Sequence, residues 1–210
     1  MEEEVTGIVR RNGALRIAFA SGRSMTCPAA ALEGCPVSVG MRLDPEVTEK
    51  KIGKAAAACC LRQVLLWQSR RDHAAEEMRR RLVTMGYPAD AADAAIRRLA
   101  DCGAVSDTRY CESLVRRKKR SRGREALIME MRAHGVEEET AAAALEKELD
   151  GPEEAESAYR FALRQLERGR EKDKVFLGLR RRGYSHDLSM EALKKALVRT
   201  EEASEEEDFL

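Results

Sequence analysis

Seven of the nine residues from Arg116 to Arg124 are lysine or arginine, and this basic run is the strongest chemical signal in the chain. So many cations in sequence repel one another unless an anion lies nearby. Arg116, Lys119 and Arg120 fall at helical spacings i, i+3 and i+4, so they share one face. The pattern favours contact with a polyanion such as DNA or with an acidic protein surface. The cations of the run are Arg116, Arg117, Lys118, Lys119, Arg120, Arg122 and Arg124.

Smaller basic groups occur at Arg70-Arg71, Arg79-Arg80-Arg81 and Arg180-Arg181-Arg182. The two triplets fall in last turns of predicted helices, where each cation complements the helix dipole by about 0.3–1 kcal/mol. That structural role explains them without a ligand. We nevertheless count the first two groups, except for Arg81, as candidate contact residues. They are Arg70, Arg71, Arg79 and Arg80.

The sequence carries no catalytic signature. It has no glycine-rich phosphate loop, no G-x-S-x-G and no H-E-x-x-H. Its six cysteines form no C-x-x-C pair and its three histidines are far apart, so we expect neither a metal site nor a cofactor. We expect the cysteines to be reduced. The acidic N-terminus lacks an apolar signal core, and no apolar run is long enough to span a membrane. We therefore predict a cytoplasmic protein that is not an enzyme.

The elements that must position these cations follow from a pattern that occurs three times, centred on Gly86, Gly135 and Gly183. An apolar residue stands four positions before each glycine and another directly after it. Such a glycine ends a helix in the left-handed conformation, so each copy predicts a helix, a tight turn and a second helix. Further apolar positions recur eight before the glycine, ten after it and fourteen after it. They are Met78, Leu127 and Val175; Ile96, Leu145 and Leu193; and Ala100, Leu149 and Leu197.

The first 44 residues differ from the rest. Asn12-Gly13 is a preferred type I′ hairpin dipeptide, and it separates predicted strands at 5–11 and 14–20. A third short strand is predicted at 24–27. We expect a small β meander, followed by a helix start at Asp44-Pro45-Glu46, where a capping side chain precedes a proline and an acid.

The predicted fold class is mainly α: three tandem three-helix repeats forming an elongated curved array, preceded by the β meander. The predicted domains are 1–44, repeat 1 at 45–104, repeat 2 at 105–150, repeat 3 at 151–200, and an acidic disordered tail at 201–210. The predicted helices lie near 54–68, 72–85 and 88–102; 106–120, 124–134 and 137–149; and 153–168, 171–182 and 185–198.

Residues 100–116 and the glycine–aromatic turns at Gly86-Tyr87 and Gly183-Tyr184 carry a family resemblance. The stretch reads Ala-Asp-Cys-Gly-Ala-Val-Ser-Asp-Thr-Arg-Tyr-Cys-Glu-Ser-Leu-Val-Arg. It resembles the RecX family, bacterial regulators of the RecA recombinase, and the similarity covers roughly residues 55–198. Three positions depart: Gly123-Arg124 where the family has Gly-Pro, Ser106 where it has Asp, and Leu114 where an aromatic is common.

The resemblance implies a non-enzymatic modulator, mainly an inhibitor, that takes part in DNA repair, DNA recombination and the SOS response. RecX-like proteins lie in the groove of the RecA–single-stranded DNA filament, where they restrain filament growth, ATP hydrolysis and strand exchange. The chain is expected to act as a monomer without a membrane partner. Whether the cations contact DNA phosphates or RecA stays open at this point.

Two other functions compete with this one. The first is a free-standing DNA-binding helical-repeat protein, since three-helix units with a basic helix can mimic helix-turn-helix domains. The alanine- and acid-rich third helices argue against it, because base readout needs polar side chains aimed at the groove. The second is a plain helical scaffold.

Overall fold

The computed structural model describes residues 1–207, and side chains through Glu202. The chain divides into two compact units, residues 1–106 and residues 107–210. The first contains the N-terminal sheet and repeat 1, and the second contains repeats 2 and 3.

Unit 1 begins with an antiparallel sheet whose strand order is β3-β2-β1-β4. The strands are β1 (Glu3–Arg11), β2 (Ala14–Phe19), β3 (Ser24–Pro28) and β4 (Arg42–Leu43), with a 3-10 helix η1 (Ala29–Glu33) before β4. Asn12 and Gly13 have φ values of 52° and 86°, as a type I′ turn requires. The predicted meander is therefore confirmed. The two-residue β4 was not predicted, because it is too short to show an alternating pattern.

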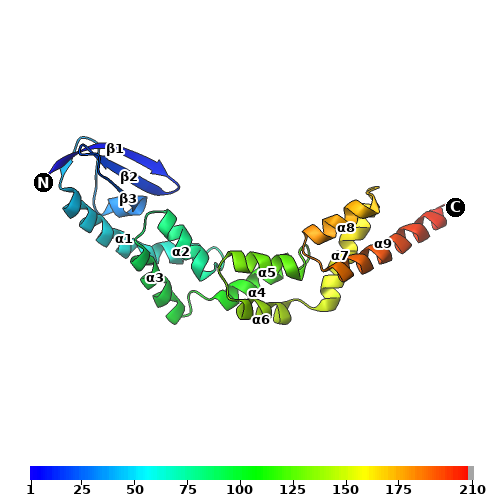
Figure 1. Cartoon of the computed structure of the whole chain (residues 1–210). Helices are drawn as coiled ribbons and strands as arrows, with labels where there is room; N and C mark the ends of the chain where they lie inside the picture. Colours follow the sequence, from blue (N-terminus) through cyan, green and yellow to red (C-terminus); the bar gives the residue numbers. More distant parts are fainter. Residues whose placement is uncertain (208–210) are drawn as a thin grey trace. The chain divides into compact units, whose positions relative to one another are not determined.

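The helices of repeat 1 are α1 (Pro45–Gln68), α2 (Ala75–Thr84) and α3 (Ala89–Asp101). The predicted start of α1 is confirmed, since Asp44 Oδ1 accepts hydrogen bonds from the backbone N–H groups of Glu46 and Val47 at 3.0 and 3.1 Å. The sheet lies against α1 (Figure 1), and one continuous apolar core joins the sheet to all three helices. The N-terminal segment thus completes the core of repeat 1.

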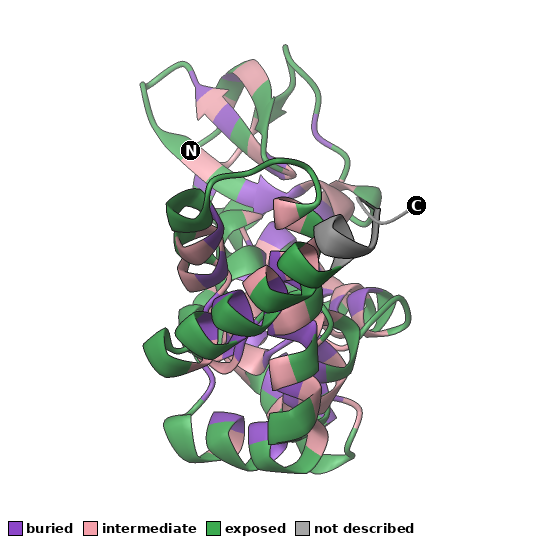
Figure 2. Cartoon of the chain, turned by 90° about the vertical axis from the view of Figure 1, so that its right-hand side faces the viewer, coloured by how far each residue is buried: buried purple, intermediate pink, exposed green. Residues whose placement is uncertain are grey.

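Unit 2 contains two further helix triplets. Repeat 2 consists of α4 (Asp107–Lys118), α5 (Arg124–Ala133) and α6 (Glu138–Glu148); repeat 3 consists of α7 (Gly151–Leu166), α8 (Lys172–Arg181) and α9 (His186–Glu207). In both repeats the first helix packs most closely on the third. Buried positions form stripes along the helices, with exposed positions between them (Figure 2). The fold is mainly α, with three tandem three-helix repeats after a small sheet.

The three predicted glycine turns share one geometry. Gly86, Gly135 and Gly183 have φ values of 86°, 81° and 81°. The next N–H donates back to the carbonyl five residues earlier in each case, which defines a Schellman motif. These bonds are Tyr87 to Leu82 at 3.1 Å, Val136 to Met131 at 3.1 Å, and Tyr184 to Leu179 at 3.4 Å. All six of these side chains are buried. The apolar residues around each glycine therefore belong both to the turn and to the core.

Three predictions need correction. Ala100 is exposed, unlike Leu149, and Leu99 takes the core position in repeat 1. Gly151 and Pro152 lie in the first turn of α7 rather than before it, because proline fits the start of a helix. The tail predicted to be disordered from residue 201 is helical through Glu207. Alanine and glutamate favour helix, and no glycine or proline stops α9. Residues 208–210 of that predicted tail lie outside the described residues.

Repeats 2 and 3 contact each other through backbone atoms at Gly123 and Gly183, where neither residue has a side chain. The N–H of Gly123 donates to the carbonyl of Arg182 at 2.9 Å, and the N–H of Glu125 donates to the carbonyl of Gly183 at 3.0 Å. A Cβ atom on Gly183 would overlap the backbone and side chain of Ala126. We call this contact the glycine joint. It requires both the left-handed turn and the missing side chain.

We predict that Gly183→Ala lowers the free energy of unfolding by at least about 2 kcal/mol, because it adds a steric overlap to the strain of a left-handed alanine. Gly169→Ala is the matched control. Gly169 has φ of 74°, but a Cβ atom there would meet no other atom within 4 Å, so only about 1 kcal/mol of backbone strain is expected. Urea unfolding of both variants gives the measurement. Equal losses would show that close approach at the joint contributes nothing.

Candidate functional site

The basic run spans the end of α4, the loop of residues 119–123 and the first residue of α5. Gly123, which closes this loop, is half of the glycine joint. The N–H of Arg124 donates to the buried carboxylate of Glu154 at 2.7 Å. The loop is therefore held on both sides of Gly123 by repeat 3, and its cations lie where the two repeats meet.

Three cations of the run are bound to carboxylates of the same unit. Arg116 Nη1 pairs with Glu148 Oε1 at 2.6 Å, and Lys118 Nζ donates to both carboxylate oxygens of Glu130 at 2.7 Å. These pairs tie α4 to α6 and α5.

Lys119 joins α4 to repeat 3. Its Nζ pairs with Glu153 at 2.7 Å and donates to the Glu148 carbonyl at 3.3 Å. The hydroxyl of Ser157, which is buried, donates to the Lys119 carbonyl at 3.1 Å. The chain itself thus supplies anions to this run. Repulsion within the run therefore does not require an external anion at Arg116, Lys118 and Lys119. Their contact with a partner stays a prediction.

The remaining cations are different. Arg117, Arg120 and Arg122 are exposed, and no carboxylate partner is recorded for them in the part of the chain that the structure describes. The Arg124 side chain is half-buried, and its backbone rather than its guanidinium makes the contact with Glu154. Fewer cations of the run are therefore free of ion pairs within the described residues than the sequence suggested.

Repeat 3 adds three arginines to this surface, which sequence reasoning missed as contact residues. The Arg182 guanidinium lies over the Phe161 ring, 3.8 Å from its centroid, and donates to the Gly178 carbonyl at 3.2 Å. Among the described residues, exposed Arg164 and Arg170 donate to neutral oxygens, the Arg160 carbonyl and the Gln165 side chain, at 3.1 Å each. We call Arg122, Arg164, Arg170 and Arg182 the junction cluster.

The positive charges of Arg122, Arg164 and Arg170 all act on the Arg182 guanidinium. The pKa of Arg182 lies below its usual value, first because of burial and then because of the positive charges of Arg122, Arg164 and Arg170. Three positive charges that repel the Arg182 guanidinium favour an anion beside it. The cluster has almost no signal in the sequence, because Arg164 and Arg170 stand in no basic run and Arg182 reads as a helix-dipole cation.

The candidates of repeat 1 lie in unit 1 and are mostly paired. Arg71 contacts Glu77 at 3.4 Å, Arg79 contacts Asp93 at 2.6 Å, and Arg80 contacts Glu76 at 3.2 Å. The Asp93 contact raises the pKa of Arg79 through its hydrogen bond and then its charge. Arg70, just after α1, is exposed and has no recorded ion pair among the described residues. Arg81, which we left out, lies over Trp67, 4.4 Å from the ring centroid.

Cysteine thiols and residue types that can bind metals also occur in the described part of the chain. No group of three or more His, Cys, Asp or Glu residues is arranged to hold a metal ion there. Burial raises the pKa of the Cys27, Cys60 and Cys111 thiols to about 11, so these side chains are neutral near pH 7. Among the described residues, no helix has the length and hydrophobicity to cross a lipid bilayer.

Fold and site together define a tandem three-helix-repeat protein with a cationic surface where repeats 2 and 3 meet. Residues 106–145, which span repeat 2, match the family model of the RecX second three-helix domain. This part of the chain is therefore similar to the second three-helix domain of RecX proteins.

Curated relatives agree over part of the chain. The regulatory protein RecX of Xanthomonas citri is 39% identical over 77 residues, which cover 36% of this chain and 48% of that protein. The regulatory protein RecX of Mycolicibacterium vanbaalenii is 38% identical over 97 residues, 45% of this chain and 50% of that one. The aligned part of the chain spans about half the length of the curated relatives it matches.

Solved structures support the fold over a larger part of the chain. A crystal structure of a regulatory protein RecX covers 92% of this chain and 99% of its own, with a TM-score of 0.59 and 19% identity. The RecX structure from Lactobacillus salivarius covers 69% of this chain and 99% of its own, with a TM-score of 0.60 and 18% identity. At this identity the likeness concerns the fold.

The ion pairs predict which cations stabilise the protein. We expect Lys119→Gln to lower the free energy of unfolding by about 1 kcal/mol, because it removes the pair with Glu153 and the bond to the Glu148 carbonyl. Arg120→Gln, one residue away and unpaired, should stay within about 0.5 kcal/mol of the wild type. Urea unfolding measures both. A larger loss of unfolding free energy for Arg120→Gln than for Lys119→Gln would contradict the view that Lys119 is the stabilising cation.

Proposed function

We propose that this protein is a non-enzymatic modulator, mainly an inhibitor, of the RecA recombinase. It binds in the groove of the RecA–single-stranded DNA filament and restrains filament growth, ATP hydrolysis and strand exchange. The match of residues 106–145 to the RecX family model supports this proposal, together with the regulatory name of the relatives. The protein acts in the cytoplasm, as a monomer, in DNA repair, recombination and the SOS response.

The junction cluster is the observation that carries the proposal. Its arginines, together with Arg117 and Arg120, are cations for which the described residues record no carboxylate partner. Arginine donates in a planar fork that matches phosphate oxygens, and neutralising phosphates releases bound counterions. DNA phosphates are thus the preferred partner of this surface. The paired arginines of repeat 1 contribute less, since binding would first have to break their ion pairs.

The runner-up is a free-standing DNA-binding protein, favoured by the same cations. Against it, the third helices of repeats 1 and 2 begin with acidic first turns, at Asp90 in α3 and at Glu138 and Glu139 in α6. Such helices repel the phosphates that flank a DNA groove, and they carry few side chains suited to base edges. Tighter binding to bare DNA than to the filament would favour the runner-up.

We predict that the purified protein slows the single-stranded-DNA-dependent ATPase of RecA at substoichiometric amounts, because one bound molecule restrains further filament growth. The measurement is steady-state ATP hydrolysis on a long single strand, with protein titrated from well below one molecule per RecA. An unchanged rate at equimolar protein would falsify the proposal.

We also predict that Arg117→Glu, Arg120→Glu and Arg122→Glu together weaken filament binding at least tenfold at low salt. The salt slope of log K should fall by about two, since three phosphate contacts on single-stranded DNA account for about 0.7 each. Anisotropy of the labelled protein measures both, and circular dichroism checks folding.

The matched control is Lys50→Glu, Lys51→Glu and Lys54→Glu, which makes the same charge change on exposed positions of α1. It should alter the affinity by less than threefold. If the control weakens binding as much as the Arg117, Arg120 and Arg122 variant, only net charge matters and the cationic surface has no specific role.

A further inference from the structure

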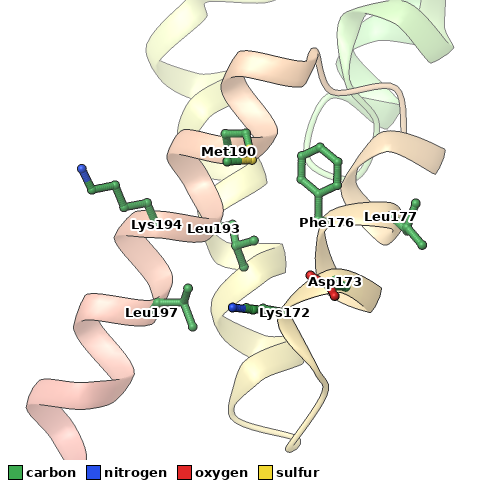
Figure 3. A pocket seen from close by; sticks show the side chains of 8 residues that line it. All are labelled: Lys172, Asp173, Phe176, Leu177, Met190, Leu193, Lys194 and Leu197. Carbon is green, nitrogen blue, oxygen red and sulfur yellow. The ribbon is translucent and has the colours of Figure 1, made fainter.

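Repeat 3 contains an apolar groove that the proposed DNA contact does not use. It lies between α8 and α9 and has a volume of about 620 Å³. Its apolar lining consists of Phe176, Leu177, Met190, Leu193 and Leu197. Phe176 comes from α8, whereas Met190, Leu193 and Leu197 follow one another along α9 (Figure 3). The groove is thus a feature of one helix pair within unit 2.

The groove lies at the edge of the core of repeat 3, because Leu193 belongs to that core and Phe176 and Leu197 pack against it. Val175 and Leu179 are the fully buried positions of α8, while Leu177 is 53% exposed and Met190 is 51% exposed. Phe176 packs against this core and meets the edge of His186, with ring centroids 5.5 Å apart, but stays partly exposed. Large apolar side chains left in water beside a concave surface are characteristic of an interaction site.

Comparison among the repeats shows that the fold does not require apolar side chains at the groove positions. Phe176 and Met190 stand seven residues before and seven after Gly183. The same positions around Gly86 are Arg79 and Asp93, which form an ion pair of 2.6 Å. Around Gly135 they are Ile128 and Ala142. Equivalent positions in the three repeats therefore hold an ion pair in repeat 1, isoleucine and alanine in repeat 2, and phenylalanine and methionine lining an open groove in repeat 3.

The shape and charge of the groove define its occupant. Met190, Leu193 and Leu197 are spaced i, i+3 and i+7, so this wall extends about two helical turns, roughly 10 Å. Lys172 and Lys194 border the groove and are exposed, with no ion pair recorded for them among the described residues; Asp173 is the one acidic lining residue. An amphipathic helix with apolar residues one turn apart and acidic neighbours complements both features.

We propose that the α8–α9 groove docks an amphipathic, acidic helical segment of a protein partner. The inference rests on the proposed function, because it takes the recombinase as that partner. Unit 2 then has two binding sites: the junction cluster binds DNA phosphates, and the groove binds protein. The two contacts on one molecule add by avidity, so filament binding exceeds binding to bare DNA.

The test uses the full chain with Leu177→Glu and, separately, Met190→Glu. Both positions are more than half exposed, so folding is retained, and the new carboxylate repels an acidic helix. The matched control is Met129→Glu, which changes the position equivalent to Leu177 in repeat 2, is 70% exposed, and lies outside the groove. Anisotropy gives the dissociation constants for RecA–single-stranded DNA filaments and for the bare strand.

We expect each groove variant to weaken filament binding at least tenfold and to change binding to the bare strand less than twofold, with the control unchanged in both. Filament binding like the wild type in both groove variants would overturn the docking site while leaving the proposed function standing. A wild-type protein that neither binds filaments nor slows the ATPase would instead overturn the proposed function, and the inference with it. Equal weakening by Met129→Glu would also overturn it.

A second copy of this chain is the competing occupant. Size-exclusion chromatography over a hundredfold range of concentration distinguishes it, because self-association through the groove would be lost in Leu177→Glu and Met190→Glu. A concentration-dependent assembly of the wild type that these variants abolish would overturn the assignment to the recombinase. A single unchanged elution volume for all three proteins supports it.

Discussion

The left-handed glycine turn is the constraint on which the helical repeats depend. It joins the second and third helix of each repeat. In repeats 1 and 3 the missing side chain also lets another backbone segment approach. A Cβ atom on Gly86 would lie 2.8 Å from the Cys27 carbonyl carbon of β3, and one on Gly183 would overlap Ala126 of α5. One residue type therefore serves both the internal turn of a repeat and its packing on the preceding element.

The charges of unit 2 are arranged around the glycine joint. Gly123 bonds to the carbonyl of Arg182, so the loop carrying Arg122 lies beside the last turn of α8. The carboxylates of Glu130, Glu148 and Glu153 neutralise the α4 side of the same loop. The result is a set of neutralised cations that hold helices together next to a set that faces outward. The second set makes no ion pair with the described residues, and this is why we propose it as the polyanion contact.

Sequence reasoning predicted the helices and turns well, because helical spacing and glycine are local signals. It found the basic run for the same reason. It could not separate paired from unpaired cations, since Arg116 and Lys119 meet Glu148 and Glu153, which are more than thirty residues away along the chain. The contribution of Arg164 and Arg170 was hidden because neither stands in a basic run. The helical end of α9 was missed because acidic composition was taken for disorder, although glutamate favours helix.

The ion pair between Arg79 and Asp93 has a consequence for how such repeats diverge. It occupies the place that Phe176 and Met190 occupy in repeat 3, and both arrangements leave the buried stripes of their helices unchanged. The two side chains seven residues before and after the glycine thus determine whether that face of a repeat carries an ion pair or an apolar groove. Recognition can be acquired or lost there independently in each copy, while the architecture is inherited intact.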